Sequence, residues 1–169
     1  MPDKYLKQNG ATLKEVPFLV TSAGAGDAGK AVALDGTGHL DVSVMPVGIG
    51  ADTKPLMASE NMTAGCYVNV WNDTGVFKIR KADGSVAGKH AHGFILTGVS
   101  LGANATVYFE GTNTQVTGQT PGDVFLSAST PGLGTATAPS ASGNIVQSVG
   151  IAISATEVNF EKGCPIELA

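Results

Sequence analysis

Short runs of β-branched and aromatic residues recur along the chain between turn signals, and they predict a mostly β fold. In residues 39–44, for example, Leu40, Val42 and Val44 alternate with polar residues, and signals such as Asp83-Gly84 mark the turns. The runs predict strands at residues 16–20, 31–34, 39–44, 66–71, 76–80, 94–99, 105–110, 124–128, 145–153 and 158–160.

Helical periodicity is weak by comparison. The best helical candidate, residues 5–16, is interrupted by Asn9-Gly10 and closed by Pro17, which cannot continue a helix. Many short strands at this spacing are typical of a sandwich or a barrel. We therefore expect an all-β fold, built as a small sandwich or barrel.

Residues 55–169 contain an apparent internal repeat. One copy opens at Gly65 (Thr-Ala-Gly-Cys-Tyr-Val) and the other at Gly122 (Thr-Pro-Gly-Asp-Val-Phe), and a second glycine follows each after the same interval, at Gly93 and Gly150. The first glycine of each copy is expected to open a turn with positive φ. The second lies inside a strand pattern, which indicates a bulge or a close backbone approach.

A third element completes each copy, at residues 106–110 and 157–161, although the loop before it is shorter in the second copy. The repeat predicts two related β-units, at about residues 55–118 and 119–169. Each unit is too thin to bury its own face, so we expect the two to pack into one core.

The first third of the chain has a different composition. Residues 1–15 are polar and carry three lysines, and residues 21–30 are a run of small residues typical of a flexible linker. We expect residues 1–50 to form an extended N-terminal arm and linker with short strands, which orders against a partner. Residues 51–169 are then the β-domain.

The charge content excludes some classes of partner. Charged residues make up 14% of the chain, which has a net charge of −4 and one arginine, whereas proteins that bind a nucleic-acid backbone need a basic face. No apolar run approaches the roughly 20 residues of a membrane-spanning helix. The start, Met1-Pro2-Asp3-Lys4, lacks the apolar core of a signal peptide. We therefore expect neither nucleic acid nor membrane as a partner.

The distribution of charge is more informative than its total. Between Glu110 and Glu157 the single charged side chain is Asp123. Because the cores of protein interfaces are depleted of charge, we interpret this stretch as a subunit contact. A water-exposed β-surface rich in Thr, Ser and Gly is the alternative.

A glycine-rich stretch raises the question of nucleotide binding. Residues 24–29 satisfy G-x-G-x-x-G, and Lys30 follows. A phosphate loop needs a helix directly after it, and Ser or Thr after the lysine. Here Ala31 follows, and residues 31–36 read as a strand that ends in a turn. The linker interpretation is therefore favoured.

Other candidate chemistry is sparse. His90 and His92 would share one face of a strand, a geometry that can bind a metal ion, but His39 is the only other histidine. Hydrogen-bonded histidines are the favoured interpretation, although symmetric rings of histidine in an oligomer would revive the metal site. We assign no catalytic, cofactor-binding or metal-binding residues.

The sequence does not indicate an enzyme. It contains no G-x-S-x-G motif, and Cys66 lies in an apolar strand, the setting of an inert thiol. We interpret Cys66 and Cys164 as small, reduced, buried residues, and leave a disulfide between them open. Tyr67 and Trp71 alternate on one strand, so we expect them to serve the core rather than a carbohydrate platform.

Two parts of the sequence resemble known virion proteins. Residues 29–41 (Gly-Lys-Ala-Val-Ala-Leu-Asp-Gly-Thr-Gly-His-Leu-Asp) resemble a segment of bacteriophage virion and fibre proteins, and residues 45–52 continue it. Residues 121–127, 147–153 and 167–169 are similar to small phage head-decoration proteins and related tail-associated modules. These motifs are turn and strand patterns, and they carry no catalytic residues.

The resemblance implies a cement protein on the capsid exterior, assembled in the host cytoplasm. Such a protein binds the lattice of the major capsid protein, often as a homotrimer, and stabilises it against internal DNA pressure. We expect the capsid contacts on the arm and on the sparsely charged β-face. The alternative is a trimeric head-fibre or tail-associated module that binds host-surface glycans.

Overall fold

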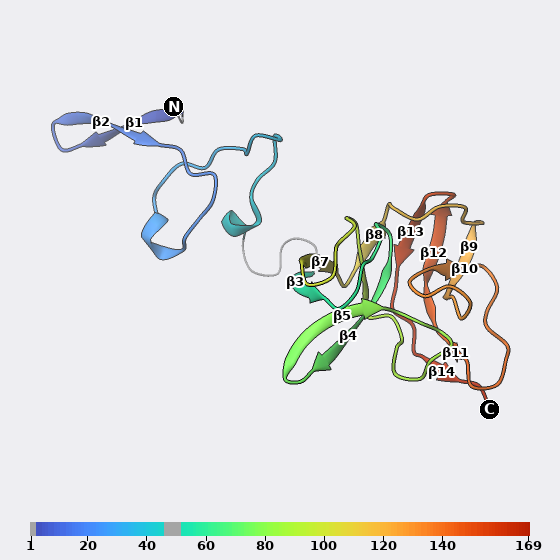
Figure 1. Ribbon diagram of the computed structural model, residues 1–169. Helices are drawn as coiled ribbons and strands as arrows, with labels where there is room; N and C mark the ends of the chain where they lie inside the picture. The colour runs from blue at the N-terminus through green and yellow to red at the C-terminus, as the bar shows by residue number, and fades with distance from the viewer. Residues whose placement is uncertain (1–2, 46–51) are drawn as a thin grey trace. The chain divides into compact units, whose positions relative to one another are not determined.

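The computed structural model describes residues 3–45 and 52–169, and it confirms the all-β fold class with a closed barrel (Figure 1). The chain divides into two compact units, Met1–Gly50 and Ala51–Ala169, here called the N-terminal unit and the C-terminal unit. The described strands are β1 (Lys4–Asn9), β2 (Thr12–Pro17), β3 (Thr53–Ala58), β4 (Tyr67–Asp73), β5 (Val76–Lys81), β6 (Gly93–Ile95), β7 (Asn104–Tyr108), β8 (Gly111–Asn113), β9 (Gly122–Leu126), β10 (Gly134–Thr135), β11 (Ile145–Val146), β12 (Ser148–Ser154), β13 (Glu157–Phe160) and β14 (Ile166–Glu167).

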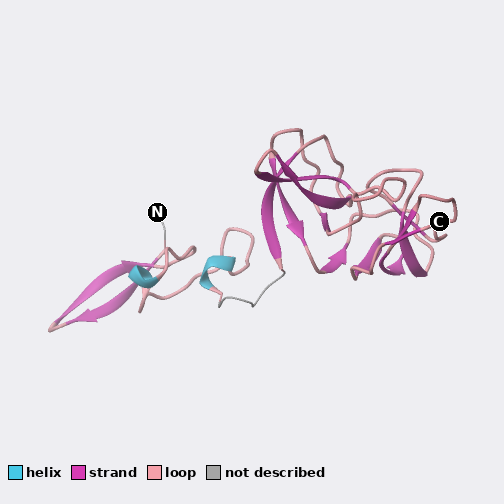
Figure 2. Ribbon diagram, turned by 90° about the horizontal axis from the view of Figure 1, so that it is seen from below, coloured by secondary structure: helices cyan, strands magenta, loops and turns pink. Residues whose placement is uncertain are grey.

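The N-terminal unit is built on a hairpin, which Figure 2 shows together with two short helical turns. Strands β1 and β2 pair antiparallel around Gly10, whose φ is 62°. Asn9 is the last residue of β1 and pairs with Thr12, so Gly10 and Ala11 form the two-residue turn, with glycine at the first central position, where positive φ is needed. The segment after the hairpin folds back, with a parallel bridge between Leu19 and Val32. The predicted extended arm is not confirmed.

Two strand predictions in this unit were wrong. Residues 39–44 do not form a strand, because Val42–Val44 is a 3₁₀-helix whose first turn is capped by the Asp41 side chain, which accepts a hydrogen bond from Ser43 N–H. Residues 31–34 contribute only the single bridge at Val32. The predicted turn at Asp35-Gly36 is present, since the Asp35 carboxylate accepts hydrogen bonds from the backbone N–H groups of residues 37 and 39.

The C-terminal unit contains a closed barrel and a second sheet. The barrel order is β3-β5-β4-β6-β7, with β3 parallel to β5 and antiparallel to β7 at the closure. The five-stranded sheet has the order β10-β9-β12-β13-β8, and β11 pairs with β14 in a separate two-stranded sheet. Strand β8 precedes the predicted boundary at residue 118 and pairs in the second sheet. The division into two related β-units stays a prediction.

The two halves of the predicted repeat share a strand arrangement. Strands β4, β6 and β7 are neighbours in the barrel, and β9, β12 and β13 are neighbours in the same order in the second sheet. The pair Ile95–Val107 corresponds to Ala152–Val158, as the repeat predicts. The first strands are offset by one residue, because Gly93 pairs with Val68 whereas Gly150 pairs with Val124. A common origin of the two halves stays a prediction.

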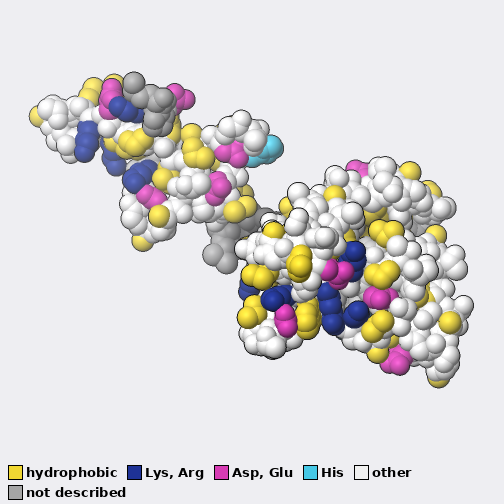
Figure 3. Space-filling model, viewed as in Figure 1, with side chains coloured by type: hydrophobic (Ala, Val, Ile, Leu, Met, Phe, Trp, Pro, Cys, Tyr) yellow, Lys and Arg dark blue, Asp and Glu magenta, His cyan; other side chains and the backbone are white. Residues whose placement is uncertain are grey.

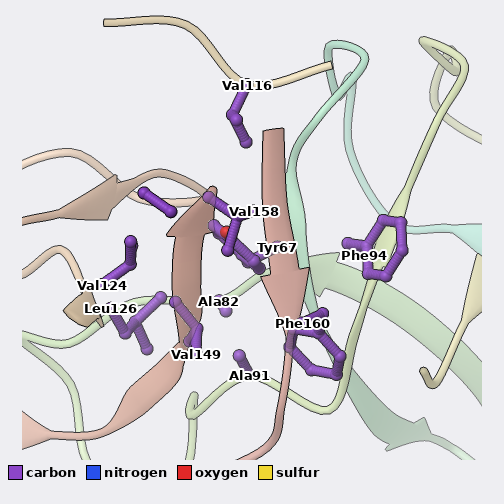
Figure 4. Close-up of a cluster of buried hydrophobic side chains, with 11 residues drawn as sticks. Tyr67, Ala82, Ala91, Phe94, Val116, Val124, Leu126, Val149, Val158 and Phe160 are labelled. Atoms are coloured by element: carbon purple, nitrogen blue, oxygen red, sulfur yellow. The ribbon is translucent and has the colours of Figure 1, made fainter. Parts of the chain in front are cut away.

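Two buried clusters replace the single core that was predicted. One lies inside the barrel and contains Val68, Ile79, Ile95 and Val107. The other, shown in Figure 4, joins the barrel wall to the second sheet and contains Tyr67, Phe94, Val124, Leu126, Val149, Val158 and Phe160. The barrel closes around its own cluster, so the first unit is not too thin to bury a face. Alternate residues of its wall serve both clusters.

A buried glutamine ties the two halves together across the second cluster. Gln147 is fully buried, and its side chain accepts a hydrogen bond from Ala91 N–H at 2.7 Å and donates one to Ala91 C=O at 2.9 Å. The same amide nitrogen donates to Gly163 C=O at 3.2 Å. Since unpaired backbone groups are costly to bury, this amide fixes the segment before β6 against the second sheet.

The repeated glycines have the roles that the sequence predicts. Gly65 and Gly122 have φ of 80° and 124°. At Gly93 a Cβ atom would lie 2.4 Å from the Tyr108 carbonyl oxygen, and at Gly150 it would lie 2.0 Å from that of Asn159. Both are therefore sites of close backbone approach, and β12 also shifts register next to Gly150.

Gly150→Ala is expected to destabilise the C-terminal unit by about 3 kcal/mol or more, because the new methyl group would overlap the backbone of β13. Gly143→Ala is the matched control: φ is also positive, at 79°, but the space is open, so a loss of only about 1 kcal/mol is expected. Urea unfolding measures both, and equal losses would contradict the close approach.

Candidate contact surfaces

The N-terminal unit has no core of its own among the described residues. None of residues 3–45 is buried. Leu6 and Leu13 lie on one face of the hairpin and are 63% and 67% exposed, and Val42 is 80% exposed. The exposed large apolar residues here are Leu6, Leu13, Val20, Val32, Leu34, Leu40 and Val42, and Figure 3 shows apolar side chains at several places on this unit. Exposed apolar residues mark a candidate interaction site where they form a contiguous patch, and Leu6 and Leu13 share one face of the hairpin.

The opposite face of the hairpin carries an unfavourable charge pair. Lys7 and Lys14 are directly opposite in the register, and like charges at such positions destabilise a hairpin. In the described part of the chain neither has an ion-pair partner, although the Lys7 ammonium donates to Gly29 C=O at 3.3 Å. Lys4 instead pairs with Glu15 at 2.7 Å. An acidic partner surface would relieve the Lys7–Lys14 repulsion.

The sparsely charged stretch forms most of the second sheet. Along β12, Val149 and Ala152 point into the core, whereas Ile151 and Ile153 are 48% and 58% exposed. In Figure 3 the charged side chains of the C-terminal unit gather near the middle of the visible face and the rest is largely uncharged. The outer face of β12 therefore exposes two isoleucines, and the one charged residue of the sparsely charged stretch, Asp123, lies opposite Ile151 on β9. Exposed apolar residues with few charges are typical of interface cores.

A third surface is an open hollow of about 580 Å³ beside the barrel. We call it the Phe77 hollow. Its lining consists of Asp52, Lys54, Leu56, Val70, Phe77, His92, Phe109 and Lys162. Leu56, Val70 and Phe109 belong to or pack against the barrel cluster, and Phe77 remains 64% exposed.

His90 and His92 form a hydrogen-bonded pair. Val70 N–H donates to His92 Nδ1 at 2.9 Å, so the proton of neutral His92 is on Nε2. That Nε2 lies 2.9 Å from His90 Nε2, to which it donates. A metal ion on His92 Nε2 would have to displace this proton, which argues against His92 as a ligand. No cluster of three or more potential metal ligands occurs among the described residues.

The environment of the pair lowers the pKa of both rings and so favours their neutral forms. Burial, His90 and Lys162 together lower the pKa of His92 to about 4, and burial followed by Lys162 lowers the pKa of His90. The sequence placed the two histidines together correctly. It did not reveal Lys162, which follows β13 and lines the same hollow as His92.

The glycine-rich stretch has no phosphate-binding geometry. Residues Ala25–Asp27 form a single 3₁₀ turn, and no helix follows Lys30. The Lys30 ammonium is paired with the Asp27 carboxylate instead. This arrangement agrees with the linker interpretation.

The two cysteines differ. Cys66 is buried, and burial raises its pKa to about 12, as expected for an inert thiol. Cys164 is exposed, so its prediction as a buried residue was wrong, because it follows β13 in the irregular segment before β14. Both thiols are free.

The two aromatic residues of β4 also differ. Tyr67 is fully buried in the cluster between barrel and sheet, as predicted. Trp71 is only half-buried: its indole N–H donates to Ser59 at 2.9 Å, and the Arg80 guanidinium lies 4.9 Å from its ring centre. One ring face and the indole N–H are therefore already engaged.

The His90–His92 pair should make stability depend on pH. Below pH 6.5 the unfolded chain binds a proton at His92, whereas the folded chain does so only near pH 4. The contribution of neutral His92 to the free energy of unfolding is therefore fully present above pH 6.5 and is lost as the pH decreases toward 4. His92→Gln, which keeps an acceptor for Val70 N–H, should lose less stability between pH 7 and pH 5 than the unmodified protein does. Urea unfolding at the two pH values measures this, with His39→Gln as the control; identical losses in all three proteins would contradict it.

No helix in the described residues has the length and hydrophobicity to cross a membrane. No family model, no curated protein and no solved structure matches this chain.

Proposed function

We propose that this chain is a bacteriophage virion protein that decorates the outer capsid surface and stabilises it by binding the lattice of the major capsid protein. The proposal combines the sequence resemblance of residues 29–52 and 121–169 with the surfaces described above. Its two capsid contacts are the N-terminal unit and the outer face of β12.

The observation that carries the proposal is the uncovered N-terminal unit. A segment of this size cannot bury enough apolar surface to be stable by itself, and an isolated two-stranded hairpin is marginal in water. With no buried residue in 3–45 and Leu6 and Leu13 both more than 60% exposed, the unit gains stability when a partner covers it. A capsid lattice offers such a partner at every repeated position.

We also propose a homotrimer as the binding form. Three copies repeat each modest contact, so their combined affinity exceeds that of one copy by a large factor when all three reach the lattice. Sedimentation equilibrium of the full chain measures the mass directly, and a monomer at all concentrations would contradict this part of the proposal.

The alternative is a trimeric fibre or tail module that binds host-surface glycans. Trp71 is a weak candidate for sugar stacking, because its indole N–H and one ring face are engaged by Ser59 and Arg80. The aromatic side chain with the largest exposed surface described in the C-terminal unit is Phe77. Glycan binding would therefore be sought at the Phe77 hollow.

An enzymatic role has no support in the described residues. Cys66 is a buried thiol with a raised pKa, His92 has both ring nitrogens occupied, and Lys30 is paired with Asp27. A non-enzymatic role accordingly stays our proposal.

Removal of residues 1–50 should abolish or strongly weaken co-sedimentation with empty capsids, because the uncovered apolar face is lost. The double variant Leu6→Ser and Leu13→Ser should weaken binding about tenfold or more in the full chain. Leu101→Ser is the control, since Leu101 is equally exposed, at 66%, but belongs to the C-terminal unit. Equal binding of all four proteins would contradict the role of the N-terminal unit, and binding by none would contradict decoration.

Ile153→Glu should also weaken capsid binding, because it places a charge on the outer face of β12 that a contact would have to desolvate. Ile166→Glu is the control, since Ile166 is 60% exposed, close to the 58% of Ile153, but lies on β14 in a different sheet. Co-sedimentation compares the two, and an equal effect of both changes would remove the β12 face from the proposal.

A further inference from the structure

We infer that the Phe77 hollow binds a short protein segment in which an apolar side chain is flanked by carboxylates. This inference deepens the proposed function and rests on it for the identity of the partner. It adds a recognition site in the C-terminal unit and the chemistry of the segment that the site accepts.

The apolar part of the hollow is preformed. Leu56 is buried in the barrel cluster, and Val70 and Phe109 pack against that cluster, so all three are held by the closed barrel. Phe77 lies near the start of β5 opposite Asn72 and is 64% exposed. An apolar side chain seated between Phe77 and this floor would remove both surfaces from water.

The charged part of the hollow is basic. Lys54 and Lys162 are exposed, and neither has an ion-pair partner in the part of the chain that the structure describes. Asp52 is the one carboxylate in the lining. The charge of Lys162 reaches the inner wall, because it contributes to the lowered pKa values of both His90 and His92. A ligand with carboxylates next to its apolar group complements this field.

The polar groups of the hollow favour a protein segment over a sugar. His92 offers no free ring nitrogen, because Nδ1 accepts from Val70 N–H and Nε2 donates to His90. The remaining polar side chains in the lining are Asp52, Lys54 and Lys162. A sugar would bring many hydroxyl groups against an apolar floor, and each hydroxyl left without a partner is costly. A leucine or phenylalanine between two glutamates would place an apolar side chain on the apolar floor and the carboxylates near the lysines, so fewer polar groups would be left without a partner.

The size of the hollow agrees with this occupant. Its volume of about 580 Å³ lies in the range of preformed binding sites and is open to solvent on one side. An exposed loop of a folded partner can therefore insert one or two side chains without unfolding.

The test is a titration of the full-length protein, labelled with ¹⁵N, with an end-blocked octapeptide that carries two leucines and two glutamates among glycines and serines. Amide shifts are expected around Phe77, Lys54 and Lys162, and the affinity should fall as salt is added. A second peptide with glutamine in place of glutamate should bind about tenfold more weakly. A sialylated oligosaccharide should leave the same amides unshifted.

One matched pair of variants and one further comparison locate the site. Phe77→Ser should weaken binding of the acidic peptide about tenfold, whereas Leu101→Ser, at an equally exposed position, should not change it. Lys162→Glu should weaken it more than Lys89→Glu does. The inference is overturned if Phe77→Ser and Leu101→Ser bind the peptide equally, if the peptide shifts none of these amides at millimolar concentration, or if the oligosaccharide shifts them and the peptide does not.

This outcome is separable from that of the capsid experiment. Peptide binding at the hollow together with no capsid binding would refute decoration and leave the inference standing. Capsid binding that is equal in the unmodified protein and in Phe77→Ser, with no peptide binding, would leave decoration standing and refute the inference.

Discussion

The alternation of side chains along the barrel wall is the constraint on which the C-terminal unit depends. On β4, Val68 points into the barrel and Tyr67 points toward the second sheet, and on β6 Ile95 and Phe94 divide in the same way. One wall therefore closes two clusters, and a shift of one residue in its register would exchange them. Gly93 and Gly150 permit the close strand contacts on either side, and Gln147 fixes the second sheet to the segment before β6.

The distribution of apolar residues between the core and the surface explains why function is sought at the surface. The C-terminal unit satisfies its own core, so Phe77, Ile151 and Ile153 are left exposed without a structural need. The N-terminal unit has the opposite property, because no described residue in it is buried. A chain in which one unit has its own buried core and the other has none is suited to a structural assembly. There, a neighbouring protein can cover the apolar residues of the unit that lacks a core. An apolar surface that a neighbour covers fits a protein partner and does not require an active site.

The sequence predicted the parts of the fold that depend on local pattern. Strands β4, β5, β7 and β13 are close to their predicted limits, because each is a short run rich in β-branched or aromatic residues. In β7 and β13 the burial also alternates along the strand. The role of Gly150 also followed from its place inside a strand pattern. The prediction of a strand that includes residues 42–44 was wrong for a different local reason. The Asp41 side chain accepts a hydrogen bond from the Ser43 backbone N–H and starts a 3₁₀ turn. The hairpin was missed although Asn9-Gly10 is a strong signal for it.

What depends on distant contacts was not predictable in this way. The joining of β8 to the second sheet, the pairing of Gly150 with Val124 and the position of Lys162 in the same hollow as His92 all depend on contacts between residues distant in the sequence. Exposure is likewise invisible in the sequence: Tyr67 and Trp71 look equivalent on one strand, yet only Tyr67 is fully buried.

Cryo-electron microscopy of capsids incubated with the full-length protein tests the central claim most directly. We predict density for the N-terminal unit on the outer capsid surface, with the Leu6 and Leu13 face of the hairpin buried against the major capsid protein. Capsids without added density, or bound protein whose hairpin face remains open to solvent, would contradict it.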